Sequence, residues 1–182
     1  MVIVIAIVVL VVVASILGLA ATRPDTLQVR RDILISAPPE TVFALVDDFH
    51  YWGSWAPQDQ TDPTMKRSYS GAASGIGAIS EWDSTGPAGK GRMEIAEASP
   101  PNKITIHVDF VKPFEAHNTN EFTFEPAGKD TEVTWVMHGA NVYMLKIMSL
   151  FIDVDRMMGK HFEDGLRALR TAAQAKATQH GK

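Results

Sequence analysis

A one-sided pattern of apolar and polar residues marks the region between Asp153 and Ala173, near the C-terminus. Its apolar residues recur at steps of three and four positions, which is the spacing of one face of an α-helix. These residues are Val154, Met158, Phe162, Gly165, Leu166 and Leu169. The opposite face is charged, so the helix must bury its apolar face against a sheet or other helices. We therefore expect a long C-terminal helix that the preceding elements cover.

Gly165 is an unusual residue within this predicted helix. A glycine inside a helix costs about 1 kcal/mol relative to alanine. Close approach of another backbone or of a ligand is one reason for a glycine at this position. The alternative is a tolerated glycine near a fraying helix end.

The middle of the chain shows the alternation that is typical of strands, punctuated by glycine and proline. Ile104, Ile106 and Val108 alternate with Thr105 and His107, and this pattern predicts a strand with one buried face. The turns are short, so neighbouring strands should pair antiparallel, because a parallel crossover needs about a dozen or more residues. Seven strands are expected, at residues 29–36, 65–69, 76–82, 91–98, 104–110, 116–124 and 131–138.

Two short helices are expected between the first and second strands. Pro39 and the acidic residue after it favour a helix that runs through Val46. Residues 47–57 then combine phenylalanine, tyrosine and two tryptophans with a histidine in a second short helical turn. This aromatic cluster forms either a binding wall, to which Trp55 would belong, or a hydrophobic plug for one end of the domain. We favour the plug for Trp52.

An uncharged run of mainly Val, Ile, Leu and Ala fills residues 1–21. At about 1.5 Å per residue it is long enough to cross the ~30 Å hydrocarbon core of a bilayer, so we expect an uncleaved, single-pass anchor. A cleaved signal peptide is the alternative, but the run exceeds the roughly 7–15 residues of a typical signal core, and no basic side chain precedes it. Residues 22–28 are expected to form a linker. Basic residues follow the span, and the positive-inside rule then predicts that the next domain is cytoplasmic.

A second apolar segment lies at residues 142–152 and is interrupted only by Lys146 and Ser149. A surface helix is not expected to be apolar nearly all round. One interpretation is a helix buried between the last strand and the long helix. The other is a lid over an interior cavity whose outer side touches lipid, since the short linker keeps the domain near the bilayer.

Composition and charge exclude several classes of function. The chain has 182 residues, no cysteine and a formal net charge of −4, so it has no disulfide, thiolate nucleophile or thiolate metal site. A mildly acidic chain without clusters of Lys and Arg lacks the electrostatic footprint of a nucleic-acid binder. The length fits one domain with an appendage. We expect the domain at residues 29–173 and a polar tail at residues 174–182.

Motifs for catalysis, metals or cofactors are not found in the sequence. Two glycine-rich stretches, residues 71–77 and 86–90, lie between predicted strands, where no helix N-terminus is available to hold a phosphate. We expect both to be hairpin turns. The histidines do not form a metal-binding pattern, and no serine lies in a nucleophile elbow. We therefore expect neither metal nor cofactor, and the sequence names no catalytic residue.

The order of these elements and three stretches of sequence resemble the START-like (SRPBCC) superfamily. The first stretch is residues 35–48, which read ISAPPETVFALVDD and are followed by two tryptophans. The others are TEVTW at residues 131–135 and GKHFEDGL at residues 159–166. The branch that the chain resembles most is that of the polyketide cyclase/dehydrase-like proteins, and the resemblance covers residues 29–171.

The resemblance implies an α+β helix-grip fold, in which a curved antiparallel sheet wraps around the long C-terminal helix and encloses an apolar cavity. The family does not share one set of catalytic residues, so no role is transferred to this chain. The cavity candidates are residues on apolar faces, two amides that interrupt one such face and lie either in the pocket or at a strand end near solvent, and a histidine beside the helical stripe. They are Trp55, Phe110, Asn118, Asn120, Phe122, Trp135, Met137, Met158, His161 and Phe162.

Three functions fit these expectations. The first is a membrane-tethered module that binds a hydrophobic small molecule or lipid in the cavity. The second is an enzyme of the polyketide cyclase/dehydrase or hydrolase type, in which Asn118, Asn120 or His161 orients the substrate or activates water. The third is a protein-interaction module whose interior is filled by its own side chains. The sequence decides neither the ligand nor the oligomeric state.

Overall fold

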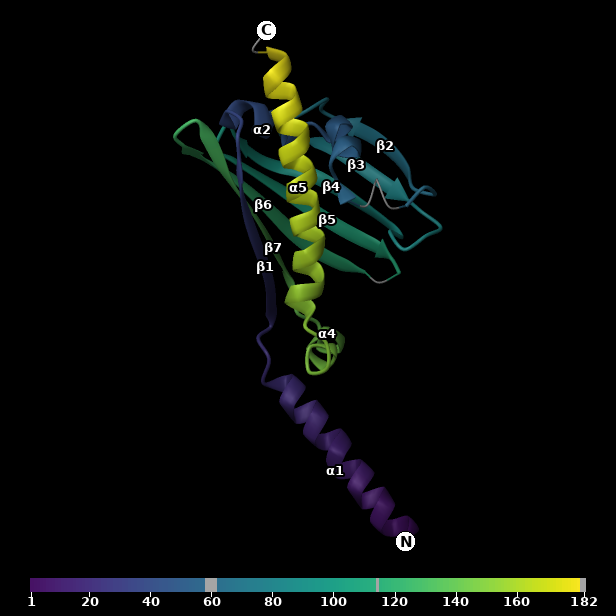
Figure 1. Ribbon diagram of the computed structural model, residues 1–182. Coiled ribbons are helices and arrows are strands. Elements are labelled where there is room, and N and C mark those ends of the chain that lie inside the picture. The colour runs from purple at the N-terminus through teal and green to yellow at the C-terminus, as the bar shows by residue number, and fades with distance from the viewer. Residues whose placement is uncertain (58–61, 114, 181–182) are drawn as a thin grey trace.

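A curved antiparallel sheet of seven strands wraps around one long helix in the computed structural model of the chain (Figure 1). The structure describes residues 1–57, 62–113 and 115–180. Neighbouring strands follow the order β1-β7-β6-β5-β4-β3-β2. The strands are β1 (Thr26–Ile35), β2 (Lys66–Gly71), β3 (Ala78–Asp83), β4 (Lys90–Ser99), β5 (Lys103–Lys112), β6 (Ala116–Ala127) and β7 (Asp130–Ala140).

The long helix crosses the concave face of this sheet, as the one-sided apolar pattern predicts (Figure 1). Phe162, Leu166 and Leu169 are buried along its length. This arrangement confirms the predicted α+β helix-grip fold. The helices are α1 (Val2–Ala21), α2 (Pro39–Asp47), the 3-10 helix η1 (Phe49–Ser54), α4 (Tyr143–Met148) and α5 (Val154–His180).

Two strands, β1 and β3, begin more than one residue away from the predicted position. Residues 26–28, which we expected in the linker, belong to β1 because they pair with residues 138–140 of β7. The linker is therefore shorter than predicted. β3 begins at Ala78 and not at residue 76, because Gly77 has a φ of 84° and belongs to the turn. The glycine-rich stretches form hairpin turns as predicted, and they join β2 to β3 and β3 to β4.

The polar tail predicted at residues 174–182 is also corrected. α5 continues to His180, and the last two residues lie outside the described residues. Alanine has the highest helix propensity, and four alanines occupy residues 172–177. Ala173 is fully buried and Ala177 packs against the core. The helix continues because this region still has an apolar side to bury.

Two tryptophans close one end of the domain against α2. The indole N–H groups of Trp52 and Trp55 donate to the backbone carbonyls of Val46 and Leu45, each at 3.0 Å. Their ring centroids lie 4.6 Å apart and both side chains are buried. The hydrogen bonds satisfy the polar edge of each indole, so the rings can fill the interior without a buried, unpaired N–H. Both rings therefore help to plug this end of the domain, and Trp52, which we favoured as a plug, also borders the interior cavity described below.

The N-terminal helix α1 extends away from the domain (Figure 1). By length and composition α1 is able to cross a membrane, and a signal sequence near an N-terminus passes the same test. α4 lies between the end of α1 and the start of α5 (Figure 1). The prediction that residues 142–152 form a buried helix is wrong, because Met144 and Phe151 are largely exposed. The segment lies at the end of the sheet, beside α1, and not between β7 and α5.

Candidate ligand cavity

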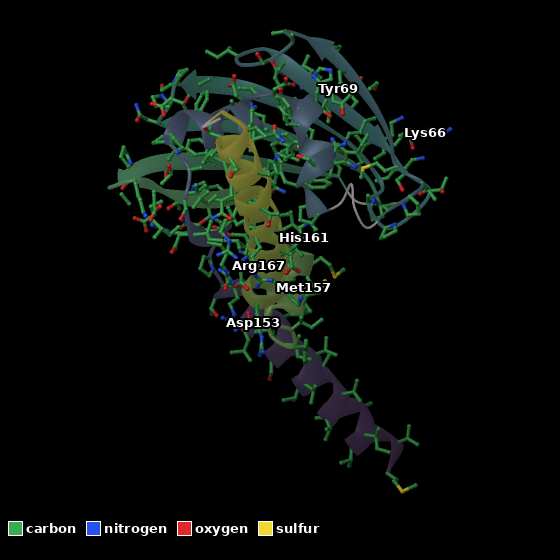
Figure 2. The ribbon with its side chains drawn as sticks, turned by 45° about the horizontal axis from the view of Figure 1, so that its top comes forward. Lys66, Tyr69, Asp153, Met157, His161 and Arg167 are labelled. Atoms are coloured by element: carbon green, nitrogen blue, oxygen red, sulfur yellow. The ribbon has the colours of Figure 1, made fainter. Side chains whose placement is uncertain are left out.

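A cavity of about 340 Å³ lies between α5 and the inner face of the sheet. Its walls are mainly apolar, since α5 and the strands both turn their apolar faces toward it. The apolar lining residues are Trp52, Ala56, Pro57, Met65, Trp82, Met93, Val108, Phe110, Trp135, Met137, Met157, Met158 and Phe162. The polar lining residues are Arg67, Asn118, Asn120 and His161. Figure 2 shows Met157 and His161 on α5, one helical turn apart.

Most of the residues predicted for the cavity line it in the structure. They come from three strands and from α5, and the fold brings them to one cavity. They are Phe110, Asn118, Asn120, Trp135, Met137, Met158, His161 and Phe162. Whether any of them contacts a ligand stays a prediction.

Trp55 and Phe122 do not line the cavity, and the structure corrects the expectation for both. Each is fully buried, and their ring centroids lie 6.3 Å apart in an edge-to-face pair. Trp52 also packs edge-on against Phe122 at 6.3 Å. These rings fill the part of the interior beneath α2 and η1. The cavity occupies the other part, where β6 presents Asn118 and Asn120.

The two asparagines of β6 face the interior, as the alternation of this strand predicts. Asn120 is only 8% exposed, and its Oδ1 accepts a hydrogen bond of 3.2 Å from the indole N–H of Trp135. Asn118 is half-buried and pairs with Gly139 on β7. Its amide lies over Gly139, where the Cβ atom of any other residue would collide with it. The alternative of a strand end near solvent is therefore wrong for Asn120, whereas Asn118, the third residue of β6, lines the cavity and also remains partly exposed.

His161 is the one titratable group of α5 that lines the cavity within the described part of the chain. Burial lowers the pKa of its imidazole, and the charge of nearby Asp164 only partly opposes this effect. The ring is therefore neutral at pH 7 and presents one donor and one acceptor nitrogen. Among the described residues, it makes no hydrogen bond with another side chain or with the backbone. A ligand in the cavity is thus able to use either nitrogen.

Arg67 brings a positive charge to the cavity wall from β2. Its Nη1 donates to Ser80 Oγ on the neighbouring strand at 2.9 Å. This residue was not predicted, because β2 shows no apolar alternation that would reveal its inner face. We also did not predict three apolar lining residues on the strands, Trp82, Met93 and Val108. The alternation of apolar and polar residues in their predicted strands was already enough to place these three on the inner face.

The chemistry of the lining favours binding and orientation of a ligand. No carboxylate lines the cavity among the described residues, so a paired acid and base are not available there. In the same part of the chain no group of His, Asp and Glu side chains is arranged to hold a metal ion. The two amides, one neutral histidine and one guanidinium are hydrogen-bonding groups in an otherwise apolar wall. Such a set fixes the orientation of a largely apolar molecule.

Comparison with known proteins identifies a family for this domain. The family model described as "Polyketide cyclase / dehydrase and lipid transport" matches residues 26–174. No curated protein sequence matches the chain.

Solved structures share the fold at low sequence identity. A protein from Chromobacterium violaceum is 17% identical, with a TM-score of 0.58 over 83% of this chain and 98% of that one. A protein from Thermus thermophilus is 19% identical, with a TM-score of 0.58 over 83% of this chain and 99% of that one. The di-domain ARO/CYC StfQ of the steffimycin biosynthetic pathway is 12% identical, with a TM-score of 0.64 over 84% of this chain and 52% of that one. These likenesses show the helix-grip fold.

Proposed function

This chain belongs to the polyketide cyclase/dehydrase and lipid transport family, and we propose that it is a membrane-tethered module that binds a hydrophobic small molecule or lipid. The observation that carries the proposal is the cavity of about 340 Å³ with its mainly apolar wall. This volume lies at the lower end of the roughly 300–1,000 Å³ that is usual for small-molecule sites. A space of this size inside the domain also argues against an interior filled by its own side chains.

The polar groups of the wall suggest what the ligand must carry. Asn118, Asn120 and His161 offer donors and acceptors, and the apolar remainder offers only dispersion contacts. Asn120 Oδ1 already accepts a bond from Trp135, but a wholly apolar molecule would cover the amide N–H groups and the imidazole without offering them a partner, which costs about 1–3 kcal/mol for each group that becomes buried. The preferred ligand is therefore mainly apolar and has at least one polar atom within reach of the amides or of His161.

The tether is proposed from α1. The most apolar 18-residue stretch of this helix has a mean hydropathy of 3.4 and is not buried against the domain. An exposed helix of that composition is stable in hydrocarbon and poorly soluble in water. A basic residue, Arg23, follows it closely, and the positive-inside rule then favours a cytoplasmic position for the domain.

An enzymatic function is the second candidate, and His161 is the observation that favours it. A neutral imidazole in an apolar cavity is able to accept a proton from a substrate or from water near pH 7. The amides of Asn118 and Asn120 would hold a substrate carbonyl nearby. A cyclase, dehydrase or hydrolase reaction of a polyketide-like substrate would fit these groups.

Native mass spectrometry of the full chain released from detergent micelles tests the binding function. We expect a co-purified, mainly apolar molecule on the wild-type protein. Met158→Trp fills the cavity and should remove the bound mass, whereas Leu34→Ala, on the outer side of β1, should keep it. A wild-type protein without bound mass, which also takes up no added fatty acid of medium chain length, would overturn the proposal. Chemical conversion of a bound polyketide-like molecule by wild type, lost in His161→Gln, would establish the enzymatic candidate instead.

A further inference from the structure

An exposed apolar surface lies beside the end of α1. It belongs to the juxtamembrane segment, residues 142–152, which comprises α4 and the turn that follows it. Met144 is 66% exposed and Phe151 is 70% exposed. No residue of the segment lines the cavity, so the prediction of a cavity lid is wrong. A group of exposed, large apolar side chains on one surface marks an interaction site.

The segment is held directly against α1. The hydroxyl of Tyr143 donates to the backbone carbonyl of Leu17, within α1, at 2.7 Å. In Figure 1, α4 lies where α1 meets the domain. The apolar surface is therefore continuous with the helix that has the composition of a membrane span.

Asn141, which directly precedes the segment, and Lys146, within it, also bind the chain that follows α1. The backbone N–H of Asn141 donates to the carbonyl of Asp25 at 2.8 Å, and its side-chain amide donates to the carbonyl of Pro24 at 2.9 Å. Lys146 reaches from α4 to form an ion pair with the carboxylate of Asp25. Together with Tyr143, these contacts hold the segment at a defined distance from the end of α1.

That distance corresponds to the interfacial layer of a bilayer. α1 ends at Ala21, so Leu17 lies four residues, or about 6 Å at 1.5 Å per residue, inside the end of the helix. If α1 spans the hydrocarbon core, the hydroxyl of Tyr143 lies close to the boundary between hydrocarbon and headgroups. Tyrosine is enriched at this depth, because its ring is apolar and its hydroxyl is polar.

The charge of the segment is directed away from its exposed surface. Lys146 is the only Lys, Arg, Asp or Glu in residues 142–152. It is only 7% exposed and is paired with Asp25. The exposed side of the segment itself therefore carries no unpaired charge, as insertion into the interfacial layer requires, and Arg23, Asp153 and Asp155 share a groove with Phe151 at the side of this surface.

We propose that the juxtamembrane segment is a second membrane contact, which inserts Met144, Phe151 and their apolar neighbours into the interfacial layer of the bilayer that α1 crosses. The inference rests on the proposed membrane tether. Two contacts fix the orientation of the domain, whereas a single helix and a short linker leave it free to tilt. Met157 lines the cavity from the first turn of α5, the end of that helix nearest to α4. The second contact therefore keeps this edge of the cavity close to the lipid.

Depth-dependent fluorescence quenching on the full chain tests the inference. The protein has no cysteine, so Met144→Cys and Phe151→Cys each carry a single environment-sensitive label in phosphatidylcholine–phosphatidylglycerol vesicles. Ile76→Cys is the matched control, because Ile76 is also an exposed apolar residue but lies in the β2–β3 turn, which bonds to the end of α2 at the far end of the domain. Val9→Cys, in the middle of α1, reports on the tether.

We expect lipid-borne doxyl quenchers to quench the labels at positions 144 and 151 at least about twofold more than the label at position 76. Iodide in the water should quench the labels at positions 144 and 151 less than the label at position 76. Equal behaviour at all three positions, with the label at position 9 quenched by lipid, would overturn the second contact and leave the tether in place. Absence of lipid quenching at position 9 would overturn the tether and the inference together. Protection from iodide without lipid quenching at positions 144 and 151 would assign the surface to a second copy of the chain and overturn the inference.

Discussion

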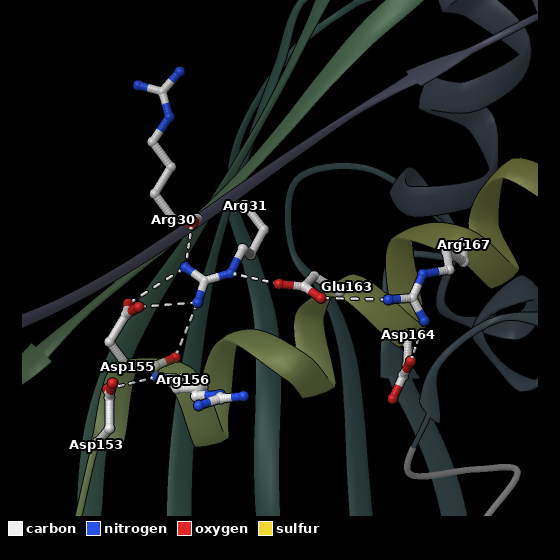
Figure 3. Close-up of polar contacts among 8 residues, drawn as sticks. All are labelled: Arg30, Arg31, Asp153, Asp155, Arg156, Glu163, Asp164 and Arg167. Atoms are coloured by element: carbon white, nitrogen blue, oxygen red, sulfur yellow. Dashed lines mark hydrogen bonds and ion pairs between the residues drawn. The ribbon is translucent and has the colours of Figure 1, made fainter.

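The guanidinium of Arg31 lies over Gly159, in the space that the Cβ atom of any other residue would occupy. Arg31 projects from β1, and Gly159 belongs to the second turn of α5. The guanidinium also pairs with Asp155 at 2.9 Å and with Glu163 at 3.0 Å, one turn before and one turn after the glycine (Figure 3). The absence of a side chain at position 159 thus allows one arginine to join the edge strand to the long helix.

The first prediction concerns the coupling of these two residues. In an Arg31→Ala background, Gly159→Ala should stabilise the protein by about 1 kcal/mol, because alanine favours the helix. With Arg31 present, the same change should give no gain or a small loss, since the guanidinium must move away from its carboxylates. The ion pairs are partly exposed, so their loss should cost no more than about 1 kcal/mol. Urea unfolding of the four proteins of this double-mutant cycle measures the coupling, and equal effects in both backgrounds would contradict it.

The second prediction concerns Gly165, where the structure shows a close approach of side chains and not of another backbone. A Cβ atom at this position would lie 3.1 Å from the ring of Pro57 and 3.1 Å from that of Trp135. Trp135 is itself stacked on Phe162 with 4.1 Å between ring centroids, so it has little room to move. Gly165→Ala should destabilise the protein by about 1–2 kcal/mol, because overpacking outweighs the gain in helix propensity.

The matched control for this variant is Gly53→Ala. No atom lies within 4 Å of the position that a Cβ would take at Gly53. The thermal midpoint of the Gly53→Ala variant should remain close to that of the wild type. If Gly165→Ala proved as stable as the control or more stable than the wild type, the contact with Pro57 and Trp135 would not be a constraint on the helix.

The third prediction follows from Phe162, which both lines the cavity and stacks on Trp135. Phe162→Ala should cost about 3 kcal/mol, at the lower end of the range for buried Phe→Ala changes, because one side of the ring already faces open space. The variant should also retain less of the bound molecule. Denaturant unfolding and native mass spectrometry measure the two effects, and a large loss of stability with unchanged binding would assign Phe162 to the core alone.

The fourth prediction is a dependence of stability on pH at Asp62. Its carboxylate accepts hydrogen bonds from the hydroxyl and backbone N–H of Thr64, from the hydroxyl of Ser84 and from the backbone N–H of Ala88. The hydroxyls of Ser84 and Thr64 are the main cause of a pKa lowered to about 2. The pKa is lower in the folded state than in the unfolded one, so the stabilisation is complete above about pH 4 and is lost as the pH falls toward 2.

Asp62→Asn should remove part of this dependence. The wild type should lose more of its unfolding free energy between pH 5 and pH 2 than the variant does, with urea unfolding at each pH as the measurement. The exposed Glu125 supplies the control variant Glu125→Gln, which should follow the wild type. Parallel curves for wild type and Asp62→Asn would show that the hydrogen bonds of Asp62 do not favour its ionised form.

The alternation along β6 is enough by itself to place Asn118 and Asn120 on the inner face of the sheet. Successive side chains of a strand point to opposite faces, so residues that share a parity with Phe122 and Phe124 must face the interior. The same argument applies to the helical stripe of α5, whose step of three and four residues fixes the buried side. Local periodicity was therefore sufficient for the inner faces of the strands and of α5, whereas the helix-grip arrangement was implied by the resemblance to a known family.

Periodicity does not determine which part of an inner face is filled. Phe122 and Asn120 share one face of β6, yet Phe122 is packed among Trp52, Trp55 and Trp135 while Asn120 borders the cavity. The difference arises from α2 and η1, which cover one end of the sheet and leave the other open. No local pattern in β6 contains this information, because the covering residues lie about seventy positions earlier in the chain.

The tertiary structure alone also decided the place of Arg67 and of the juxtamembrane segment. β2 is mostly exposed and lacks apolar alternation, so only its pairing with β3 shows that Arg67 faces the cavity. The sequence of residues 142–152 determined that the segment needs an apolar environment. The bonds of Tyr143 to α1 and of Lys146 to Asp25 decided where that environment must be. Contacts between residues more than a hundred positions apart depend on the packing of the whole chain, and the residues on either side of each contact do not encode its partner.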